Sequence, residues 1–173
     1  MRTTLLVLAV GLLFALPAGA DDFQDAAKLL KSGQHQQALE RVNKILAAKP
    51  RDPQARFLKG LIFTEQGNSR EAIDIFSKLT QDYPELPEPY NNLAVIYAQK
   101  GEYDSARVAL ETAVRTAPNW AVARENLGDI YARLAAAEYD RAAKLDRDNK
   151  TAPAKLTAVR SLFAASTPAK PKS

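Results

Sequence analysis

Residues of the same kind recur every 34 positions along most of this chain. Glycine returns at Gly33, Gly67 and Gly101, and four further columns of residues keep the same interval. These columns are Ala38, Ala72 and Ala106; Pro50, Pro84 and Pro118; Gly60, Ala94 and Gly128; and Phe63, Tyr97 and Tyr131. Five columns with one period indicate a repeat protein, in which each unit buries its apolar face against its neighbours.

Each unit is expected to form two helices. In the clearest unit, residues 87–120, apolar residues keep the three-and-four spacing of one helix face as far as Tyr97, and Gly101 then breaks the helix. A second helix follows and ends at Pro118. Ala106 lies on its apolar stripe, where a small side chain lets two antiparallel helices approach closely.

At these positions the units resemble tetratricopeptide repeats. The family pattern of a large residue, then Leu-Gly, Tyr, Ala, Phe and Pro is matched by Tyr90, Leu93-Ala94, Tyr97, Ala106, Leu110 and Pro118 in one unit, and by Arg56, Lys59-Gly60, Phe63, Ala72, Phe76 and Pro84 in the unit before it. The resemblance covers most of residues 21–149. It implies an all-α helix-turn-helix solenoid. The chain resembles a small exported bacterial member of the family.

We expect three full repeats, a fused fourth repeat and a C-terminal capping helix. Their expected bounds are about 21–52, 53–86, 87–120 and 121–149 for the repeats and 154–165 for the capping helix, which is expected to cover the C-terminal edge of the stack. The first repeat is interpreted as the N-terminal cap, because Asp22 and Asp25 stand where large apolar residues are usual. Residues 166–173 contain two prolines and no large apolar residue, which predicts disorder.

The fourth unit lacks the turn of the others. No Gly or Pro occurs between Asp129 and Asn149, so we expect one continuous helix from about Trp120 to Leu145, roughly 39 Å long at 1.5 Å per residue. The alternative is a tight kink near residues 135–137. A continuous helix cannot fold back on itself, so its second half is expected to run beyond the stack or to bend over its end.

The first 20 residues have the pattern of a cleaved secretory signal peptide. Arg2 precedes an apolar run from Leu5 to Leu16, and small residues lead to a predicted cleavage after Ala20. The run is shorter than the roughly 20 residues that span a bilayer, so no stable membrane anchor is expected. Export, with a periplasmic location, is therefore predicted. Loss of Arg2 lowers the formal charge from +4 to +3, which does not favour nucleic-acid binding.

Conventional catalytic sites are not favoured by this composition. The chain has no cysteine and one histidine, His35, which is expected to be a solvated turn residue. Glu125 and Asp129 lie four residues apart and could suggest a metal or acid-base pair, but an ion pair between Asp129 and Arg133 is the simpler interpretation. We therefore expect no enzyme activity, no cofactor and no metal.

The resemblance implies that the first helices of successive repeats line an inner, concave surface where ligands bind. The residues assigned to binding on this surface are Phe57, Leu61, Glu88, Asn91, Asn92, Val95, Glu125, Asn126, Asp129 and Arg133. Its amides could hydrogen-bond the main chain of a peptide, and its apolar residues could hold a side chain. Alternatively, Asn92 and Asn126 tie neighbouring helices together, and Phe57 and Leu61 pack laterally.

The expected function is a non-catalytic scaffold that binds a peptide segment or a helix of another protein, in the assembly or maintenance of the cell envelope. Members that capture the C-termini of chaperones carry a clamp of Lys, Asn, Asn, Lys and Arg. The corresponding residues include Phe23, Ala27, Leu58, Glu88 and Asn92, so this partner class is not expected. The alternatives are self-association through the fused helix, giving a homodimer, and binding of cell-wall glycans.

Overall fold

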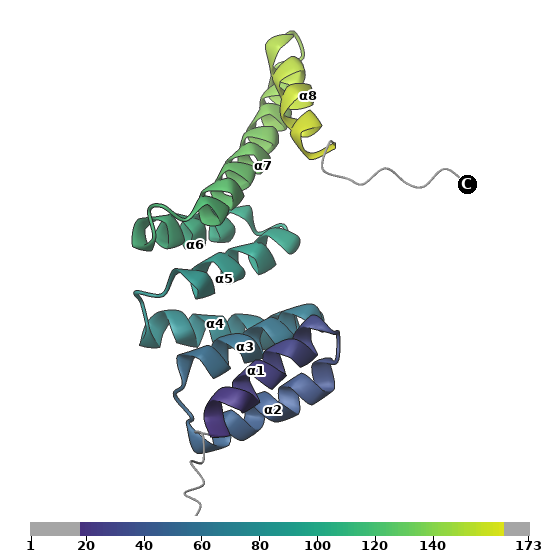
Figure 1. Cartoon of the computed structure of the whole chain (residues 1–173). Helices are drawn as coiled ribbons and strands as arrows, with labels where there is room; N and C mark the ends of the chain where they lie inside the picture. The colour runs from purple at the N-terminus through teal and green to yellow at the C-terminus, as the bar shows by residue number, and fades with distance from the viewer. Residues whose placement is uncertain (1–17, 165–173) are drawn as a thin grey trace, which may run out of the picture.

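A computed structural model describes residues 18–164 as eight helices without a strand (Figure 1). The helices are α1 (Ala18–Lys31), α2 (His35–Ala48), α3 (Pro53–Glu65), α4 (Ser69–Asp82), α5 (Pro87–Gln99), α6 (Tyr103–Thr116), α7 (Ala121–Leu145) and α8 (Thr151–Ala164). The all-α solenoid expected from the repeats is confirmed. Most of the predicted signal peptide and the predicted disordered tail lie outside the described residues.

The first six helices form three hairpins, which stack in chain order (Figure 1). Gly33, Gly67 and Gly101 make the turns within the hairpins, with φ angles of 73°, 76° and 78°. This left-handed conformation is costly for other residues but free for glycine. After Gly67 the amide of Asn68 donates to the carbonyl of Phe63 at 2.8 Å, which satisfies an otherwise free acceptor at the end of α3. The glycine column is thus explained by its turns.

The alanine column of the repeat lies in the core between helices. Ala38, Ala72 and Ala106 are each completely buried. The larger apolar cluster runs through the second, third and fourth repeats around Phe76 and Leu110. A smaller cluster joins α1 and α2 to α3. Small residues therefore set the distance between helices, and the large residues beside them supply most of the buried apolar area.

The fourth repeat is one unbroken helix, α7, of 25 residues, as predicted, and no kink interrupts it. Its first half packs against α5 and α6, whereas its second half leaves the stack (Figure 1). Tyr131, Ala135, Tyr139, Ala142 and Leu145 recur at helical spacing along it, and this apolar stripe is only partly covered, since Tyr131 and Leu145 keep 48% and 88% of their surface exposed. Without a turn, the fourth repeat has no second helix in the stack to cover the stripe.

Helix α8 packs along the projecting half of α7 instead of across the edge of the stack (Figure 1). It begins at Thr151, three residues before the expected start. Asn149 explains the start, because its side-chain oxygen accepts hydrogen bonds from the amides of Thr151 and Ala152 at 3.1 and 3.0 Å. Ala152 and Leu156 are buried. The short connection after α7 places α8 beside the exposed half of α7 before it could reach the stack.

Candidate protein-binding groove

A pocket of about 420 Å³ lies between α5 and α7, the first helices of the third and fourth repeats. We call it the α5–α7 pocket. Its lining consists of Ala94, Val95, Ala98, Gln99, Tyr103, Leu110, Asn126, Asp129, Ile130 and Arg133. Apolar side chains dominate this set, and the amide, carboxylate and guanidinium groups all come from α5 and α7. The pocket can therefore hold an apolar group with polar contacts beside it.

The pocket brings together four of the ten residues assigned to binding from sequence: Val95, Asn126, Asp129 and Arg133. Glu88, Asn91 and Asn92 lie elsewhere on α5, Glu125 lies on α7, and Phe57 and Leu61 lie on α3. The assignment missed the second-helix residues Tyr103 and Leu110. Leu110 occupies a position of the repeat pattern, so its sequence signal was present. It was left out of the binding residues because only first helices were expected to line the inner surface.

We use the word groove for the expected inner surface carried by α3, α5 and α7, the first helices of the second to fourth repeats. The amides assigned to it are engaged within the protein. The Asn126 Nδ2 donates to the Asn91 Oδ1 at 2.8 Å, which joins α7 to α5, and Asn91 is only 8% exposed. The Asn92 Nδ2 donates to the carbonyl of Glu88 at 2.9 Å, within the same helix. Each side-chain amide has further donors or acceptors that these hydrogen bonds do not use. Their visible role is to connect helices and to fix the side chains that border the groove.

Arg133 packs between two aromatic rings. The prediction that it forms an ion pair with Asp129 is wrong. Its guanidinium carbon lies 4.3 Å from the ring centroid of Phe163 and 5.7 Å from that of Tyr103. These contacts are cation–π interactions, which are attractive because the face of an aromatic ring is electron-rich. Arg133 therefore ties α8 to the start of α6 beside the pocket, and Asp129 is left without that partner.

Three carboxylates, those of Glu88, Glu125 and Asp129, border the groove on exposed positions. None of them forms an ion pair with another residue in the range 18–164. The nearby cation, Arg133, is held by the two rings. Of the three carboxylates, only that of Asp129 belongs to the lining of the pocket.

On α3, Phe57 and Leu61 serve mainly as packing residues. The rings of Phe57 and Phe76 are tilted by 55° with their centroids 5.5 Å apart, a favourable geometry for an aromatic pair. Leu61 packs against both apolar clusters. Both residues are half-buried. The lateral-packing interpretation describes these contacts, and neither residue lines the α5–α7 pocket.

A polar network joins α6 to α7 through Arg107, Glu111 and Tyr131. Arg107 donates from Nη1 to the Glu111 Oε1 at 2.9 Å, and the Tyr131 hydroxyl donates to the same oxygen at 3.1 Å. The hydrogen bond from Arg107 is the main cause of a lowered pKa at Glu111, and the bond to Glu111 raises the pKa of Tyr131. In a regular repeat the second helix would pack at this place.

No group of three or more potential metal ligands occurs among residues 18–164, and the pair of Glu125 and Asp129 has no third member. His35 is not a solvated turn residue as expected. It is half-buried, and its Nε2 lies 3.0 Å from the Glu65 Oε2. Within the same range, no helix is both long and apolar enough to cross a membrane.

Comparisons with known proteins agree with this architecture. Two family models described as tetratricopeptide repeat match residues 23–87 and 63–128. The chain is 31% identical over 104 residues to human protein O-mannosyl-transferase TMTC1, a match that covers 58% of this chain. It spans only 12% of the length of that relative.

Solved structures of low sequence identity share the fold. TTC0263 from Thermus thermophilus is 21% identical, with a TM-score of 0.63 over 84% of this chain and 83% of that one. The second repeat domain of human RPAP3, in complex with an HSP70 peptide, is 16% identical, with a TM-score of 0.58 over 65% of this chain and 95% of that one. These structures show the shared fold. The two family models, which together cover residues 23–128, show that the chain belongs to the tetratricopeptide repeat family.

Proposed function

We propose that this chain is a non-catalytic scaffold that binds a peptide segment or a helix of another protein in the α5–α7 pocket and along the adjoining groove. The observation that carries the proposal is an apolar pocket whose lining includes the Asp129 carboxylate, with Glu125 four residues before it on α7; neither carboxylate is in an ion pair within the described part of the chain. A stack of repeats keeps such a surface in place, so little ordering entropy is lost on binding.

The charges favour a basic partner segment. An aliphatic side chain can pack on Val95 and Ala98, which are half-buried in the pocket lining, and a Lys or Arg side chain beside it can pair with Asp129. The guanidinium of Arg133 packs on two aromatic rings and not on Asp129, so the Asp129 carboxylate stays available to a cation of the partner. Complementary charge at an interface raises the rate of association and discriminates against partners of the wrong sign.

The fold neighbours support peptide binding of this general kind. The second repeat domain of human RPAP3 is in complex with the HSP70 peptide SGPTIEEVD, which ends in acidic residues. This chain has Phe23, Ala27, Leu58, Glu88 and Asn92 at the positions that correspond to the clamp for such peptides. We therefore propose that it does not bind this class of acidic C-terminus in the groove.

Two synthetic peptides of equal length test the proposal, one with leucine and lysine and one with leucine and glutamate. The basic peptide is expected to bind the whole chain more tightly, and a variant with Glu125→Gln and Asp129→Asn is expected to weaken it about tenfold. Glu85→Gln, an exposed carboxylate between α4 and α5, is the matched control. Equal weakening by control and double variant, or tighter binding of the acidic peptide, contradicts the proposal.

Self-association is a second candidate, which the α7–α8 hairpin favours. Leu145 and Leu162 on this hairpin are 88% and 61% exposed, at the part of the molecule that projects from the stack. Sedimentation of the chain over a hundredfold range of concentration tests it. A Leu145→Gln variant that removes a concentration-dependent mass supports the homodimer, and a constant monomer mass rejects it.

The place of action proposed is the periplasm, with a role in assembly or maintenance of the cell envelope. The support is the sequence pattern of residues 1–20 alone. N-terminal sequencing of the protein recovered from a periplasmic extract is expected to start at Asp21. Recovery of the uncleaved chain from the cytoplasm contradicts this location.

A further inference from the structure

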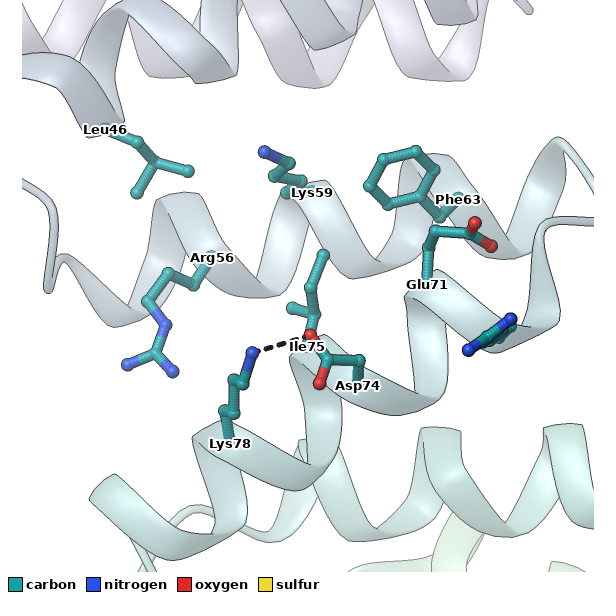
Figure 2. A pocket seen from close by; sticks show the side chains of 9 residues that line it. Leu46, Arg56, Lys59, Phe63, Glu71, Asp74, Ile75 and Lys78 are labelled. Atoms are coloured by element: carbon teal, nitrogen blue, oxygen red, sulfur yellow. Dashed lines mark hydrogen bonds and ion pairs between the residues drawn. The ribbon is translucent and has the colours of Figure 1, made fainter.

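A second hollow, of about 600 Å³, lies between α2 and α4 over α3 (Figure 2). We call it the α2–α4 hollow. Its lining consists of Leu46, Arg56, Lys59, Phe63, Arg70, Glu71, Asp74, Ile75 and Lys78. Lys59 and Phe63 come two residues after Phe57 and Leu61, which border the groove. Two residues turn an α-helix by about 200°, so the hollow and the groove lie on opposite sides of α3.

The hollow exists because two repeat positions carry unusual residues. In the third repeat these positions hold Tyr90, whose hydroxyl donates to the carbonyl of Thr80 at 3.3 Å, and Leu93, which is 6% exposed. Both side chains pack against neighbouring helices. In the second repeat the same positions hold Arg56 and Lys59. Arg56 turns its guanidinium to Asp82 and the Lys59 ammonium donates to Asn43, so these two side chains do not supply the apolar packing of Tyr90 and Leu93.

Two of the cations in the hollow already have carboxylate partners. Arg56 pairs with Asp82, and the Lys78 ammonium donates to Asp74 at 2.8 Å. Figure 2 shows the second of these pairs on α4, facing the residues of α3. These pairs neutralise the side of the hollow that is nearest to Arg56.

The other two cations have no carboxylate partner in the described part of the chain. The Lys59 ammonium donates to the amide oxygen of Asn43 at 2.9 Å and lies 6.0 Å from the ring centroid of Phe63. Arg70 forms no ion pair within residues 18–164. Glu71 is the one carboxylate of the lining that forms no ion pair within residues 18–164. With Asp82, the partner of Arg56, the hollow has four cations and three carboxylates, and this excess of positive charge, with two cations lacking a carboxylate partner, favours a negative ligand.

We propose that the α2–α4 hollow binds an acidic segment of a partner protein. An Asp or Glu side chain pairs with Lys59 and Arg70, and a neighbouring apolar side chain packs on Phe63 and Ile75. The apolar lining and the volume favour a peptide over a small inorganic anion, which would leave those two side chains uncovered. Because this site shares no residue with the α5–α7 pocket, the scaffold can hold two partners of opposite charge at once.

The test uses the whole chain and a fluorescent peptide of alternating leucine and aspartate, read by anisotropy. A double variant, Lys59→Gln with Arg70→Gln, is expected to weaken binding about tenfold, whereas Lys150→Gln, an exposed cation outside the hollow, changes it less than about twofold. Glu71→Gln is expected to strengthen binding, because it removes the unpaired carboxylate of the hollow. Equal effects of the double variant and Lys150→Gln overturn the proposal.

A second variant separates the hollow from general charge effects. Arg56→Tyr with Lys59→Leu copies the third repeat, where the same residue types pack in the core, so it is expected to fold and to abolish binding of the acidic peptide. It should leave the basic peptide of the groove unaffected, and Asp129→Asn should leave the acidic peptide unaffected. Retained acidic-peptide binding in the filled variant, or its displacement by inorganic phosphate at equal concentration, overturns the proposal.

Discussion

The ring of Phe76 lies directly against Gly60. A Cβ atom built on this glycine would be 2.5 Å from the Phe76 Cε1, and Phe76 is completely buried, so the ring has no free space to retreat into. Gly128 occupies the same column of the repeat, yet a Cβ there would meet no atom within 4 Å. One column thus contains a glycine required by packing and a glycine whose packing partner was lost with the turn.

Alanine at these two glycines is therefore expected to have opposite effects on stability. Gly60→Ala overpacks the contact with Phe76 and should lower the free energy of unfolding by about 1 to 3 kcal/mol. Gly128→Ala adds a methyl group in open space within a helix and should raise it by about 0.5 to 1 kcal/mol. Urea denaturation followed by circular dichroism measures both, and effects of the same sign would contradict the position of these residues in the repeat.

The stack was predictable from sequence because its determinants are periodic. A helix pair must place a small residue at each close approach and a glycine at each turn, so Gly60 and Gly101 reveal their structural roles by their spacing alone. The missing turn after Asp129 likewise predicted α7 as a single helix. The packing of α8 was not predictable, because it depends on where the second half of α7 points and no repeated position encodes that direction.

The Asn91–Asn126 pair is expected to show coupled effects. Asn126→Ala leaves the Asn91 Oδ1, on a buried residue, without its partner, which should cost about 1 to 3 kcal/mol. Changing both residues to Ala removes the unsatisfied group as well, so the double variant should cost less than the sum of the single variants. A double-mutant cycle from urea denaturation measures the coupling.

Asn92→Ala is the control for this cycle. Its amide bonds only to the carbonyl of Glu88 within α5, so it is expected to have a small effect on stability and no coupling to Asn126. Additive effects of Asn91 and Asn126 would show that the bond between them contributes little, and would leave both amides available for a bound main chain.

The network around Glu111 predicts a defined dependence on pH. Its pKa is lowered in the folded state, chiefly by the hydrogen bond from Arg107. A lowered folded pKa gives stability that is complete above the ordinary Glu pKa of about 4.3 and is lost as the pH falls through the folded value. The stability difference between the native chain and Glu111→Gln should therefore be constant near neutral pH and shrink below about pH 4.

Tyr131→Phe provides the matched control, since it removes one of the two donors to Glu111 and keeps the ring. In this variant the loss of unfolding free energy below about pH 4 should be smaller than in the native chain, but it should still be present. The midpoints of urea denaturation, measured from pH 7 to pH 3, compare the native chain with Glu111→Gln and with Tyr131→Phe. A difference that grows as the pH falls would contradict the assigned sign.

The chemistry of the groove was less predictable than the fold. Spacing placed Asp129 and Arg133 four residues apart on one helix face, which favours an ion pair when only one helix is considered. In the structure Arg133 instead contacts Tyr103 and Phe163, from two other helices. Contacts between residues distant in sequence decide which charges stay unpaired, and the charge available to a partner depends on them.

Arg133 is expected to hold α8 in place through its two aromatic neighbours. Each cation–π contact contributes about 0.5 to 1 kcal/mol, so Arg133→Met, which keeps an apolar stem but loses the charge, should release the C-terminal end of α8. Hydrogen exchange measured by mass spectrometry should then speed up at the amides of residues 157–164 and stay unchanged in α5. Arg141→Met is the control, because Arg141 is exposed and pairs only with Glu138. Faster exchange throughout the stack would instead show that Arg133 supports the whole fold, and unchanged exchange in α8 would show that Ala152 and Leu156 suffice to anchor it.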